Sequence, residues 1–584
     1  MYEQIFDPVG GSLALSSLVA ALPLLTIFVL LGVLRMKAQW AALISLAVAL
    51  VVAVAVYGMP VGQAFGSAAE GAAFGIFPIM WIVVAAIWIY NMTVTTGHFD
   101  VLRRSFGTVS SDQRIQAIII AFCFGALMEA LAGFGTPVAI SAVMLIALGF
   151  SPLKAASVSL VANTAPVAFG AIAVPITTLA QTTGLPIGEL ASTVGRQTPL
   201  LALIVPLALV LLVDRRRGIR QCWLPASVAG IVFAAAQFIS SNYLSVELTD
   251  IIAALAAAGA LVILLRFWQP AEELTGARLS DEEMTSRIAT ATATAHAVET
   301  GGSRPGANTA VRTGTGPGDG PGSADKPHGP TGDEPARDSG REVLKAYAPY
   351  LIIITVFSVA QIGAVKTLLA TGSVSFPWPG LHITTPTGAA PSAATFAFGW
   401  LPAAGTLLLV SGLITMAALG LSPAAALTAF GATLTQLKWA ILTVAAVLAL
   451  AYVMNLSGQT ITIGKWIAGT GSFFAFLSPV LGWLGVAVTG SDTSSNALFG
   501  TLQVAAAKQA GLSPVLLAAA NSSGGVLGKM ISPQNLAIAA AATGMAGREG
   551  DLFRKVIGWS LGFLLVMCVL VYLQSTPVLS GMLP

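Results

Sequence analysis

Residues 128–140 read MEALAGFGTPVAI, and this stretch sets the carboxylate of Glu129 beside a break in an otherwise apolar segment. Two glycines and a proline follow Glu129 within eight residues. Glycine permits tight turns and proline removes a helical hydrogen bond, so we expect one helix to end here and another to begin. A chain that avoids charge elsewhere thus carries an acid at a helix break, which makes Glu129 the first candidate for chemistry.

The composition indicates a membrane protein. Only 9% of the 584 residues are Asp, Glu, Lys or Arg, and the mean hydropathy is +0.84, whereas soluble domains contain about 25% charged residues. Several apolar runs approach the roughly 20 residues that cross a bilayer core. These runs are 13–34, 41–57, 71–90, 197–213, 246–265, 350–365, 400–420, 438–454 and 556–573. We therefore predict an all-α polytopic membrane protein. No basic segment precedes the first run, so no cleaved signal peptide is expected.

The composition also argues against other classes of protein. The net charge of +3 is small for this length, so no nucleic-acid partner is expected. Cys123, Cys222 and Cys568 lie too far apart in the sequence for a metal or redox motif. The sequence contains no nucleophile–base motif, zinc motif or cofactor fingerprint, so neither an enzyme nor a cofactor or metal site is predicted.

Loop charges orient the chain in the membrane. Residues 1–12 contain acids and no base, which places the N-terminus outside, whereas the basic segment DRRRGIR at 214–220 is predicted inside. Residues 268–343 carry most of the remaining charge and are rich in glycine and proline, which predicts a disordered cytoplasmic loop. A plain linker is the favoured interpretation of this loop, and a regulatory tether is the alternative.

An internal repeat is visible in the sequence. GFSP at 149–152 recurs as GLSP at 511–514, and an acid lies 20 residues before the first motif and 19 before the second. Three residues after each motif also share one spacing: Asn163, Gly170 and Pro175 in the first copy, and Asn521, Gly528 and Pro533 in the second. An odd number of predicted spans separates the copies, so they are inverted relative to the membrane, as in many secondary transporters.

The repeat divides the chain into four parts. We predict a first inverted half at 1–213, linking spans at 214–267, the cytoplasmic loop at 268–343 and a second inverted half at 344–584. Each half has three spans, a helical hairpin and two more spans, and the hairpins lie at 115–150 and 470–511. This gives about 12 transmembrane helices. Loop charges do not distinguish re-entrant hairpins from hairpins that cross the membrane fully.

Four helix breaks at membrane depth define the candidate site. They are AGFGTP at 132–137, NTAP at 163–166, TGSDTSSN at 489–496 and NSSGG at 521–525. Broken helices are tolerated in a membrane only where they face protein or a watery cavity. Each new helix start offers free N–H groups and a partial positive charge, which suit a carboxylate ligand. Inverted symmetry is expected to bring the four breaks together near the midplane.

Glu129 and Asp492 occupy equivalent places beside the two hairpin tips. Loss of solvent favours the neutral acid, so either residue could take up and release a proton. The alternatives are a structural carboxylate bonded to loop N–H groups for Glu129 and a helix cap for Asp492. Lys529 could pair with a substrate carboxylate, pair with an acid, or extend to the membrane interface. Gln534 and Asn535 could bind a substrate hydroxyl, or serve as polar residues at a helix start.

These segments resemble the L-lactate permease family. The resemblance is carried by EALAGFGTPVAISAV (129–143), LVANTAPVAFGAIAVPI (160–176), GSDTSSNALFGTLQ (490–503) and NSSGGVLGKMISPQN (521–535), and it covers nearly the whole chain except 268–343. It implies a carrier of the bacterial inner membrane that takes up lactate, often glycolate too, by proton symport. It also implies a superfamily fold of two inverted halves with re-entrant hairpins and elevator-type motion.

The hairpin tips depart from one pattern of that superfamily. Its dicarboxylate carriers have Ser-Asn-Thr at both tips, whereas here one tip has SSN at 494–496 and the other has GFGTP. This departure favours coupling to protons over coupling to sodium.

The sequence therefore predicts a multi-pass secondary transporter of the bacterial plasma membrane that imports L-lactate, D-lactate and glycolate with a proton. Glu129 and Asp492 are the predicted proton-coupling residues. The predicted substrate-binding residues are Gly133, Gly135, Thr136, Asn163, Thr164, Ser494, Ser495, Asn496, Asn521, Ser522, Ser523, Lys529, Gln534 and Asn535. The alternatives are a sodium-coupled or exchanging organic-anion carrier of the same fold and, less favoured, a membrane-embedded enzyme. The expected partners are the acid, the proton and the lipid bilayer, and the sequence leaves a homodimer open.

Overall fold

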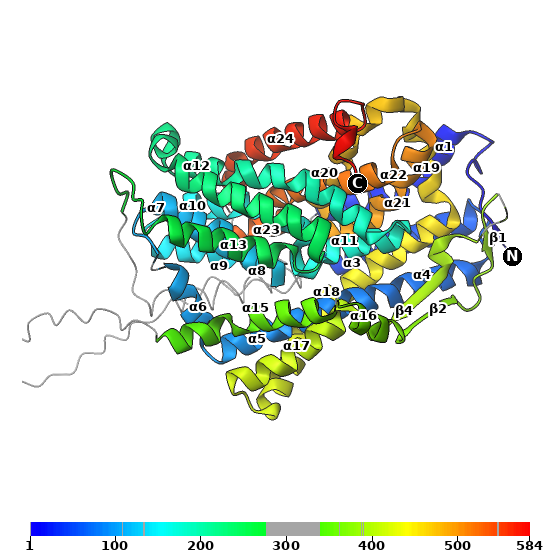
Figure 1. The fold of residues 1–584 in the computed structure, drawn as a ribbon. Coiled ribbons are helices and arrows are strands. Elements are labelled where there is room, and N and C mark those ends of the chain that lie inside the picture. Colours follow the sequence, from blue (N-terminus) through cyan, green and yellow to red (C-terminus); the bar gives the residue numbers. More distant parts are fainter. Residues whose placement is uncertain are drawn as a thin grey trace, which may run out of the picture.

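The computed structural model describes residues 2–34, 36–107, 109–131, 133, 135–275, 339–360, 362–386, 388, 390–545 and 548–584. In this part the chain forms an elongated helical bundle with two small sheets at one end (Figure 1). Most of the predicted disordered loop, residues 276–338, lies outside the described residues. The end of that predicted loop is helical, because α15 begins at Gly340.

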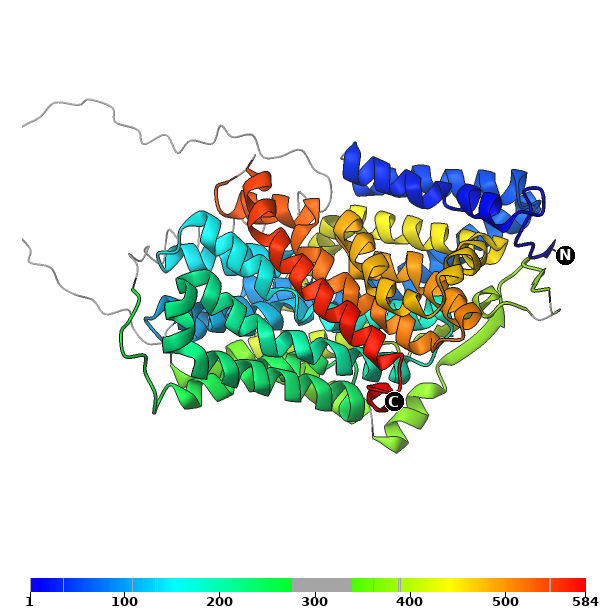
Figure 2. The ribbon, with the colours of Figure 1, turned by 90° about the horizontal axis from the view of Figure 1, so that it is seen from above.

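In the described part of the chain, thirteen α-helices precede the loop; the pair α10 (Pro152–Ala162) and α11 (Gly170–Thr183) is bent at a break, and α12 (Ile187–Ile239) is long and kinked. The others are α1 (Leu13–Ala20), α2 (Leu22–Phe28), α3 (Ala38–Ala55), α4 (Val61–Phe74), α5 (Trp81–Thr95), α6 (His98–Gly107), α7 (Gln113–Gln116), α8 (Gly125–Leu131), α9 (Thr136–Ala147) and α13 (Thr249–Leu264). Short π-helical segments continue several of these helices, among them η3 (Ala117–Phe124), which joins α7 to α8. Figure 2 shows the N-terminal helices along one edge of the bundle.

The helices after the loop again include a long helix, α18 (Pro423–Ser457), and a helix pair separated by a short break, α22 (Pro514–Gly528) and α23 (Pro533–Ala542). The others are α15 (Gly340–Ala360), α16 (Gly363–Ala370), α17 (Ala404–Leu419), α19 (Gln459–Ile467), α20 (Phe474–Thr489), α21 (Asp492–Ala510) and α24 (Glu549–Gln574). A single turn, η8 (Lys529–Ile531), separates α22 from α23.

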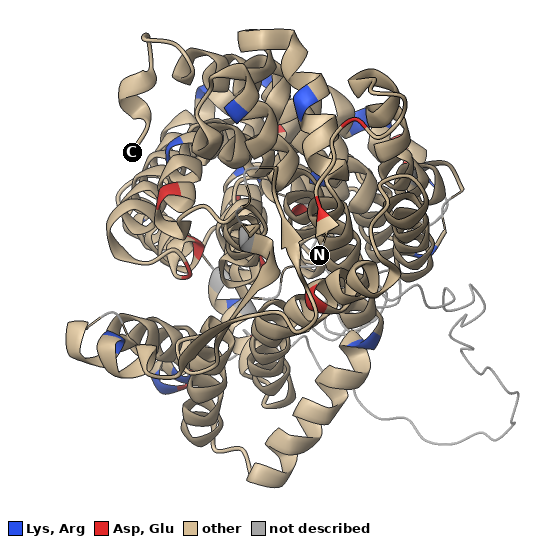
Figure 3. Ribbon diagram, turned by 90° about the vertical axis from the view of Figure 1, so that its right-hand side faces the viewer, with Lys and Arg blue, Asp and Glu red and all other residues tan. Residues whose placement is uncertain are grey.

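Four short strands depart from the all-helical prediction. β1 (Tyr2–Glu3) pairs in parallel with β3 (Ile383–Thr384), and β2 (Ser373–Pro377) pairs antiparallel with β4 (Thr395–Gly399). Three of the strands lie between Ser373 and Gly399, where β-branched and aromatic residues occur between glycines and prolines. Figure 3 views this end of the molecule and shows charged residues scattered over a mostly uncharged ribbon.

The described residues contain nine helices long and apolar enough to cross a bilayer, or ten if the bent pair α10–α11 counts as one span. The segment Ile187–Leu244 counts once although it has 58 residues. At about 1.5 Å per residue it is far longer than the roughly 30 Å of a bilayer core. Non-helical backbone at Asp214 and Arg215 divides it into two arms. The predicted total of 12 spans therefore stays a prediction.

Small residues let the long helices approach one another closely. The segments Val61–Thr95 and Pro423–Ser457 each have 35 residues, and α4 packs along α18. A Cβ added to Gly71 would lie 2.5 Å from the backbone oxygen of Leu448, and one added to Gly75 would lie 2.9 Å from Ala445 Cα. Close backbone contact through glycine is typical of helix packing in membranes. α18 also packs against α21, an arm of the second hairpin.

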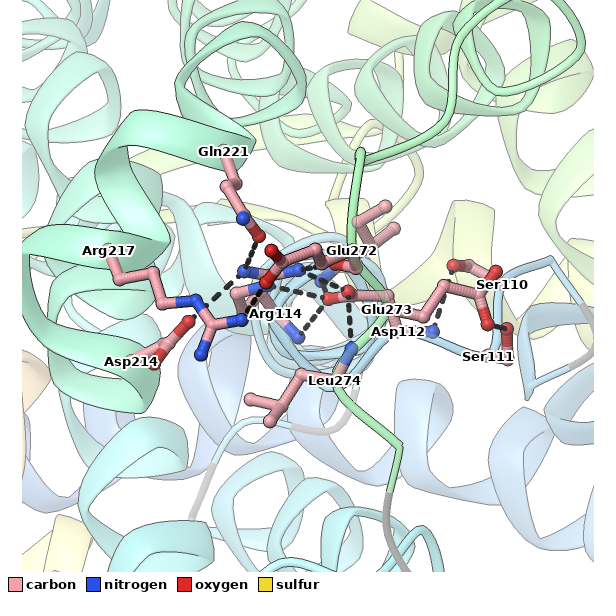
Figure 4. A network of polar contacts seen from close by, with 11 residues as sticks. Ser110, Ser111, Asp112, Arg114, Asp214, Arg217, Gln221, Glu272, Glu273 and Leu274 are labelled. Carbon is pink, nitrogen blue, oxygen red and sulfur yellow. Dashed lines mark hydrogen bonds and ion pairs between the residues drawn. The ribbon is translucent and has the colours of Figure 1, made fainter.

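A buried arginine fixes the base of the first hairpin (Figure 4). Arg114, at the start of α7, donates to both oxygens of Asp112 at 3.0 and 2.6 Å and to Asp214 at 3.1 Å. It also donates to Gln221 and to the backbone oxygen of Glu272, both at 2.5 Å. The hairpin base is thus joined to the turn in α12 and to the chain that follows α13. Arg114 therefore has a structural role, because it links these three segments through hydrogen bonds and ion pairs.

Candidate functional site

The two hairpin tips meet around a small cavity. Its walls come from the first tip, the start of α11, the second tip, and the break between α22 and α23. The lining residues are Glu129, Gly133, Val167, Gly170, Ala171, Val174, Pro175, Gly490, Ser491, Asp492, Thr493, Lys529 and Gln534. The cavity measures about 50 Å³, and one water needs roughly 10–15 Å³ on this scale. The space therefore suits a molecule of a few heavy atoms.

A buried ion pair connects the first hairpin to the break after α22. Lys529 Nζ donates to Glu129 Oε1 at 2.5 Å, and the side chains are 8% and 3% exposed. Of the three options for Lys529, the structure shows the pairing with an acid. Glu129 Oε2 has no hydrogen-bond partner in the described part of the chain. This carboxylate is therefore held by a cation from the far end of the sequence, with one oxygen left open.

Asp492 is held by neutral groups instead. Its Oδ2 accepts from Ser522 Oγ at 2.6 Å and from Asn496 Nδ2 at 3.3 Å, while its Oδ1 is buried without a partner among the residues described. The N-cap of α21 is Ser491, whose side chain accepts from the Ser494 backbone N–H. Since Ser491 provides the cap, the capping alternative for Asp492 is not what the structure shows.

A chain of amides surrounds Asp492. Asn521 donates to Asn496 Oδ1 at 2.9 Å, and Asn496 donates to the Pro175 backbone oxygen at 3.1 Å. Gln503 donates to Asn521 Oδ1 at 3.3 Å and accepts from Ser478 at 2.9 Å. These bonds tie α21 to α11, α20 and α22. They satisfy buried polar groups that would otherwise each cost about 1–3 kcal/mol.

The backbone at the start of α11 is unusual where it faces Glu129. Ala171, Ile172 and Ala173 have φ between 45° and 58°, a region that β-branched residues rarely occupy. Such backbone strain is concentrated at functional sites in proteins. A bend of 65° comes just before these residues, between Pro152–Ala162 and Val167–Thr183. A Cβ at Gly170 would lie 2.9 Å from Glu129 Oε1, so glycine here lets the carboxylate approach the break.

The structure separates the predicted substrate-binding residues into two groups. Gly133, Lys529 and Gln534 line the cavity itself. Behind the wall are Ser522, Asn496 and Asn521, in the Asp492 network, and Gly135, Thr136, Asn163, Thr164, Ser494, Ser495, Ser523 and Asn535.

Several of these residues bond to backbone oxygens of the protein. Thr164 donates within its own turn to the Val161 oxygen at 2.7 Å, and Asn535 donates to the Lys529 oxygen at 2.9 Å. Ser495 of α21 donates across the second hairpin to the Gly482 oxygen of α20 at 3.3 Å. A hydroxyl one turn from a free carbonyl bonds locally, which sequence spacing alone does not reveal. Polar atoms of Thr136, Asn163 and Ser523 are buried without a recorded partner among the described residues.

Two buried acids escaped the sequence reasoning. Asp250, in the first turn of α13, is fully buried and its Oδ1 accepts from Gln237 Nε2 at 2.9 Å. Glu70 in α4 is fully buried, and neither of its oxygens has a partner in the described ranges. Asp250 lies inside the apolar run 246–265 and Glu70 directly precedes the run 71–90. An acid in or beside an apolar run is the sequence signal that could have identified both. No group of three or more His, Cys, Asp or Glu suited to a metal ion occurs among the described residues.

A second, larger cavity lies at the end of the molecule that carries the strands. It measures about 380 Å³ and is lined by Gln4, Thr182, Thr183, Thr385, Pro391, Ala393, Asn455, Leu456, Ile461, Lys465, Thr501, Val504, Ala505, Lys508 and Gln509. The helices α11 and α21 line both cavities. From Asp492 to Lys508 the helix rises about 24 Å at 1.5 Å per residue.

Broken helices and buried charges around a central cavity, in a bundle of apolar helices, define the class of multi-pass membrane transporters. The comparisons with known proteins agree with this class and narrow it. The chain belongs to the L-lactate permease family, whose sequence profile, described as L-lactate permease, matches residues 16–578. The protein is thus a multi-pass bacterial membrane protein and a permease, and it is not an enzyme.

Individual relatives match over the full length. The chain is 41% identical to the L-lactate permease of Bacillus subtilis, with 100% of both chains covered. It is 40% identical to the glycolate permease GlcA of Escherichia coli, covering 100% of this chain and 99% of the relative. Among solved structures it is similar to Neisseria gonorrhoeae MtrF, described as an antimetabolite efflux pump, with 13% identity, a TM-score of 0.42 and coverage of 87% of this chain and 82% of MtrF.

Proposed function

We propose that this protein imports L-lactate and related 2-hydroxymonocarboxylates, glycolate and D-lactate among them, by proton symport across the bacterial plasma membrane. Membership of the L-lactate permease family and relatives named for L-lactate and glycolate support the choice of substrate. The small central cavity fits an acid of this size. One anion and one proton carry no net charge together, so the pH gradient and not the membrane voltage drives uptake.

One observation supports the coupling to protons: among the described residues Lys529 is the single base that lines the cavity, and it is already paired with Glu129. A substrate carboxylate that binds Lys529 displaces Glu129 from its only cation. An unpaired carboxylate in a buried site costs several kcal/mol, so Glu129 takes up a proton as the anion arrives. The charge inside the cavity is then the same before and after loading. This exchange of partners at Lys529 couples one proton to one anion.

The neighbouring polar groups orient the acid in this proposal. The second tip brings Ser491, Asp492 and Thr493 to the cavity, and Gln534 faces it from the start of α23. Gln534 and backbone N–H groups of the tips bind the substrate hydroxyl and its second carboxylate oxygen. Asp492, fixed by Ser522 and Asn496, is the second candidate for a proton. The amide chain behind it keeps the second tip in place.

We also propose that transport is of the elevator type, between two inverted halves at 1–213 and 344–584. The two 35-residue segments Val61–Thr95 and Pro423–Ser457 have the lengths expected of equivalent elements. The shorter arm of each hairpin, 12 residues in α9 and 16 in α20, measures about 18–24 Å, less than a bilayer core, and favours re-entrant hairpins, while the longer arms Gln113–Leu131 and α21 have 19 residues each. Helices 214–267 link the halves. The N-terminus lies outside and the loop 268–343 inside in this arrangement.

Uptake of labelled lactate into proteoliposomes tests the proposal. An acid-outside pH step should drive accumulation in sodium-free buffer, and a voltage of either sign alone should not. Glycolate should compete with lactate, and pyruvate, which lacks the hydroxyl, should compete less well. Accumulation that follows a sodium gradient at fixed pH would replace proton symport by sodium coupling. Exchange without accumulation under either gradient would make the protein an exchanger.

A further inference from the structure

Asp250 is a buried acid at the back of the proposed proton site. It lies in the first turn of α13, outside the cavity lining, and α13 packs against α8, the helix that carries Glu129. Asp250 and Glu129 therefore lie on two helices in contact, although no hydrogen bond joins their carboxyl groups among the described residues. The cavity is on one side of Glu129 and Asp250 belongs to the linking helices on another. Glu129 thus borders the substrate cavity, and its helix α8 also contacts the linking helix that carries Asp250.

The contacts of Asp250 leave one oxygen open. Its Oδ1 accepts from Gln237 Nε2 at 2.9 Å; the same nitrogen lies 3.4 Å from the Ala165 backbone oxygen, and Thr198 donates to Gln237 Oε1 at 3.2 Å. Its Oδ2 is buried without a partner in the described part of the chain, as is Oε2 of Glu129. Each acid therefore has one oxygen that can carry a proton without breaking an existing bond.

No other charged group competes for Asp250. Glu129 is the one ionisable group that acts on it electrostatically among the residues described. Of the elements packed against α13, η3 has only the buried Cys123 thiol, and η5 (Ser240–Leu244) has only the exposed Tyr243. The ionisable groups of α12 lie elsewhere: Arg196 bonds Asn242 and Met582, and Asp214 bonds Arg114 at the cytoplasmic turn. An ionised Asp250 would have no cation of its own, so its resting form carries the proton.

We propose that Asp250 is a proton donor to Glu129, so that the coupled proton reaches the site through the linking helices and not through the substrate cavity. This inference rests on the proton symport proposed above. When the substrate takes Lys529, the O–H bond of Asp250 breaks, a water between the two open carboxyl oxygens accepts that proton and gives up another, and an O–H bond forms on Glu129. The negative charge passes from Glu129 to Asp250, and a proton from solution restores Asp250. Gln237 positions Asp250 through the bond to Oδ1 and also bonds the break before α11.

The test compares Asp250→Asn with the native protein in proteoliposomes. Asparagine has the shape of the neutral acid and can still accept from Gln237, so a merely structural role would leave transport unchanged. Exchange of labelled for unlabelled lactate at equal pH needs no net proton transfer, and we expect it to stay close to the native rate. Uptake driven by a pH step should fall about 100-fold, the lower end of what a positioned proton-transfer group contributes. Native uptake should increase as the external pH falls, and in Asp250→Asn this increase should disappear.

Thr198→Val is the matched control, because it removes a bond to Gln237 and leaves Asp250 in place. We expect it to keep pH-driven uptake and its pH profile. The proposal is overturned if Asp250→Asn keeps native pH-driven uptake, if it loses exchange and uptake together, or if Thr198→Val copies its effect. A native protein that exchanges lactate but does not accumulate it under a pH step would instead refute the proposed function.

Discussion

The two hairpins place their acids at the same cavity but hold them differently. Glu129 of the first hairpin is paired with a cation, Lys529, from the other end of the sequence. Asp492 of the second hairpin accepts from the neutral groups of Ser522 and Asn496. The helix Gln113–Leu131 is wholly buried, whereas Gln459–Thr489 is buried over less than half of its span. The first arm of one hairpin is thus fully embedded and its acid is paired with a cation, whereas the first arm of the other is partly exposed and its acid is hydrogen-bonded to neutral groups.

This difference teaches where a switch can be built. A buried ion pair has two states, paired and exchanged, and the arrival of one anion can convert one into the other. A network of neutral amides and hydroxyls has no such exchange, because each bond is lost without a charged replacement. We therefore assign the change of protonation chiefly to the first hairpin and the orientation of the substrate chiefly to the second. The following predictions test that division.

Glu129→Gln should have the largest effect on transport. The glutamine cannot take the proton that accompanies the anion, so accumulation under a pH step should be abolished. Exchange at equal pH should continue, since Lys529 is free to bind the substrate carboxylate. Both rates are measured with labelled lactate in proteoliposomes. If accumulation and exchange both survive, Glu129 does not carry the proton.

Glu70→Gln is the control for this prediction. Glu70 is also a fully buried acid, but it does not border the central cavity. We expect accumulation to persist in this variant. Loss of accumulation in both variants would mean that the effect is common to buried acids and not specific to the first hairpin.

Lys529→Met should reduce stability as well as uptake. Removing one partner of a buried ion pair leaves an uncompensated charge, which costs about 3–5 kcal/mol. The double variant Glu129→Gln with Lys529→Met has no buried charge at this position and should recover most of the loss. Thermal unfolding in detergent measures the four proteins of this cycle. Additive losses in the double variant would contradict an energetic link between the two residues.

Asp492→Asn should have a smaller effect than Glu129→Gln. The asparagine oxygen can still accept from Ser522, but the second carboxyl oxygen is lost and a buried polar group is left unsatisfied, which costs about 1–3 kcal/mol. We expect KM for lactate to rise about tenfold or more, while some pH-driven accumulation remains. Ser522→Ala, which removes the donor and keeps the acid, should raise KM without changing the pH profile. An Asp492→Asn protein with no accumulation and native KM would reverse the roles of the hairpins.

Sequence reasoning found the elements of the site because the signals are local. An acid, two glycines and a proline at 129–137 identify the first tip, and the matched spacing after Asn163 and Asn521 identifies the two breaks. The structure brings Glu129, Asp492 and Lys529 to one cavity. The apolar runs likewise indicated the helical bundle, because a bilayer demands them.

The remainder depends on contacts between distant segments. No pattern near Lys529 selects Glu129 over a substrate as its partner, and 400 residues separate the two. Thr164 bonds a backbone oxygen of its own turn and Ser495 bonds one of the facing helix α20, choices that follow from the rotamer and the packing and not from the sequence. Nothing in the sequence near Arg114 shows that its partners come from positions 112, 214 and 221, two of which lie about 100 residues away. Buried acids outside the repeat, such as Asp250, had no counterpart to draw attention to them.

Lys508→Gln should have the smallest effect, because it lies in the second cavity and far from the ion pair. Lys508 and Lys465 sit in the last turns of α21 and α19, where part of their charge offsets the carbonyl ends of those helices. The rest of their positive charge attracts anions to the second cavity, which α11 and α21 line. Salt screens this attraction over about 10 Å at 0.1 M. We expect KM to rise about twofold at low ionic strength, with no change in pH-driven accumulation and no change at high salt. Lys438→Gln, an exposed lysine outside both cavities, should leave KM unchanged. An equal response in the two variants would show that surface charge in general, and not the second cavity, attracts the substrate.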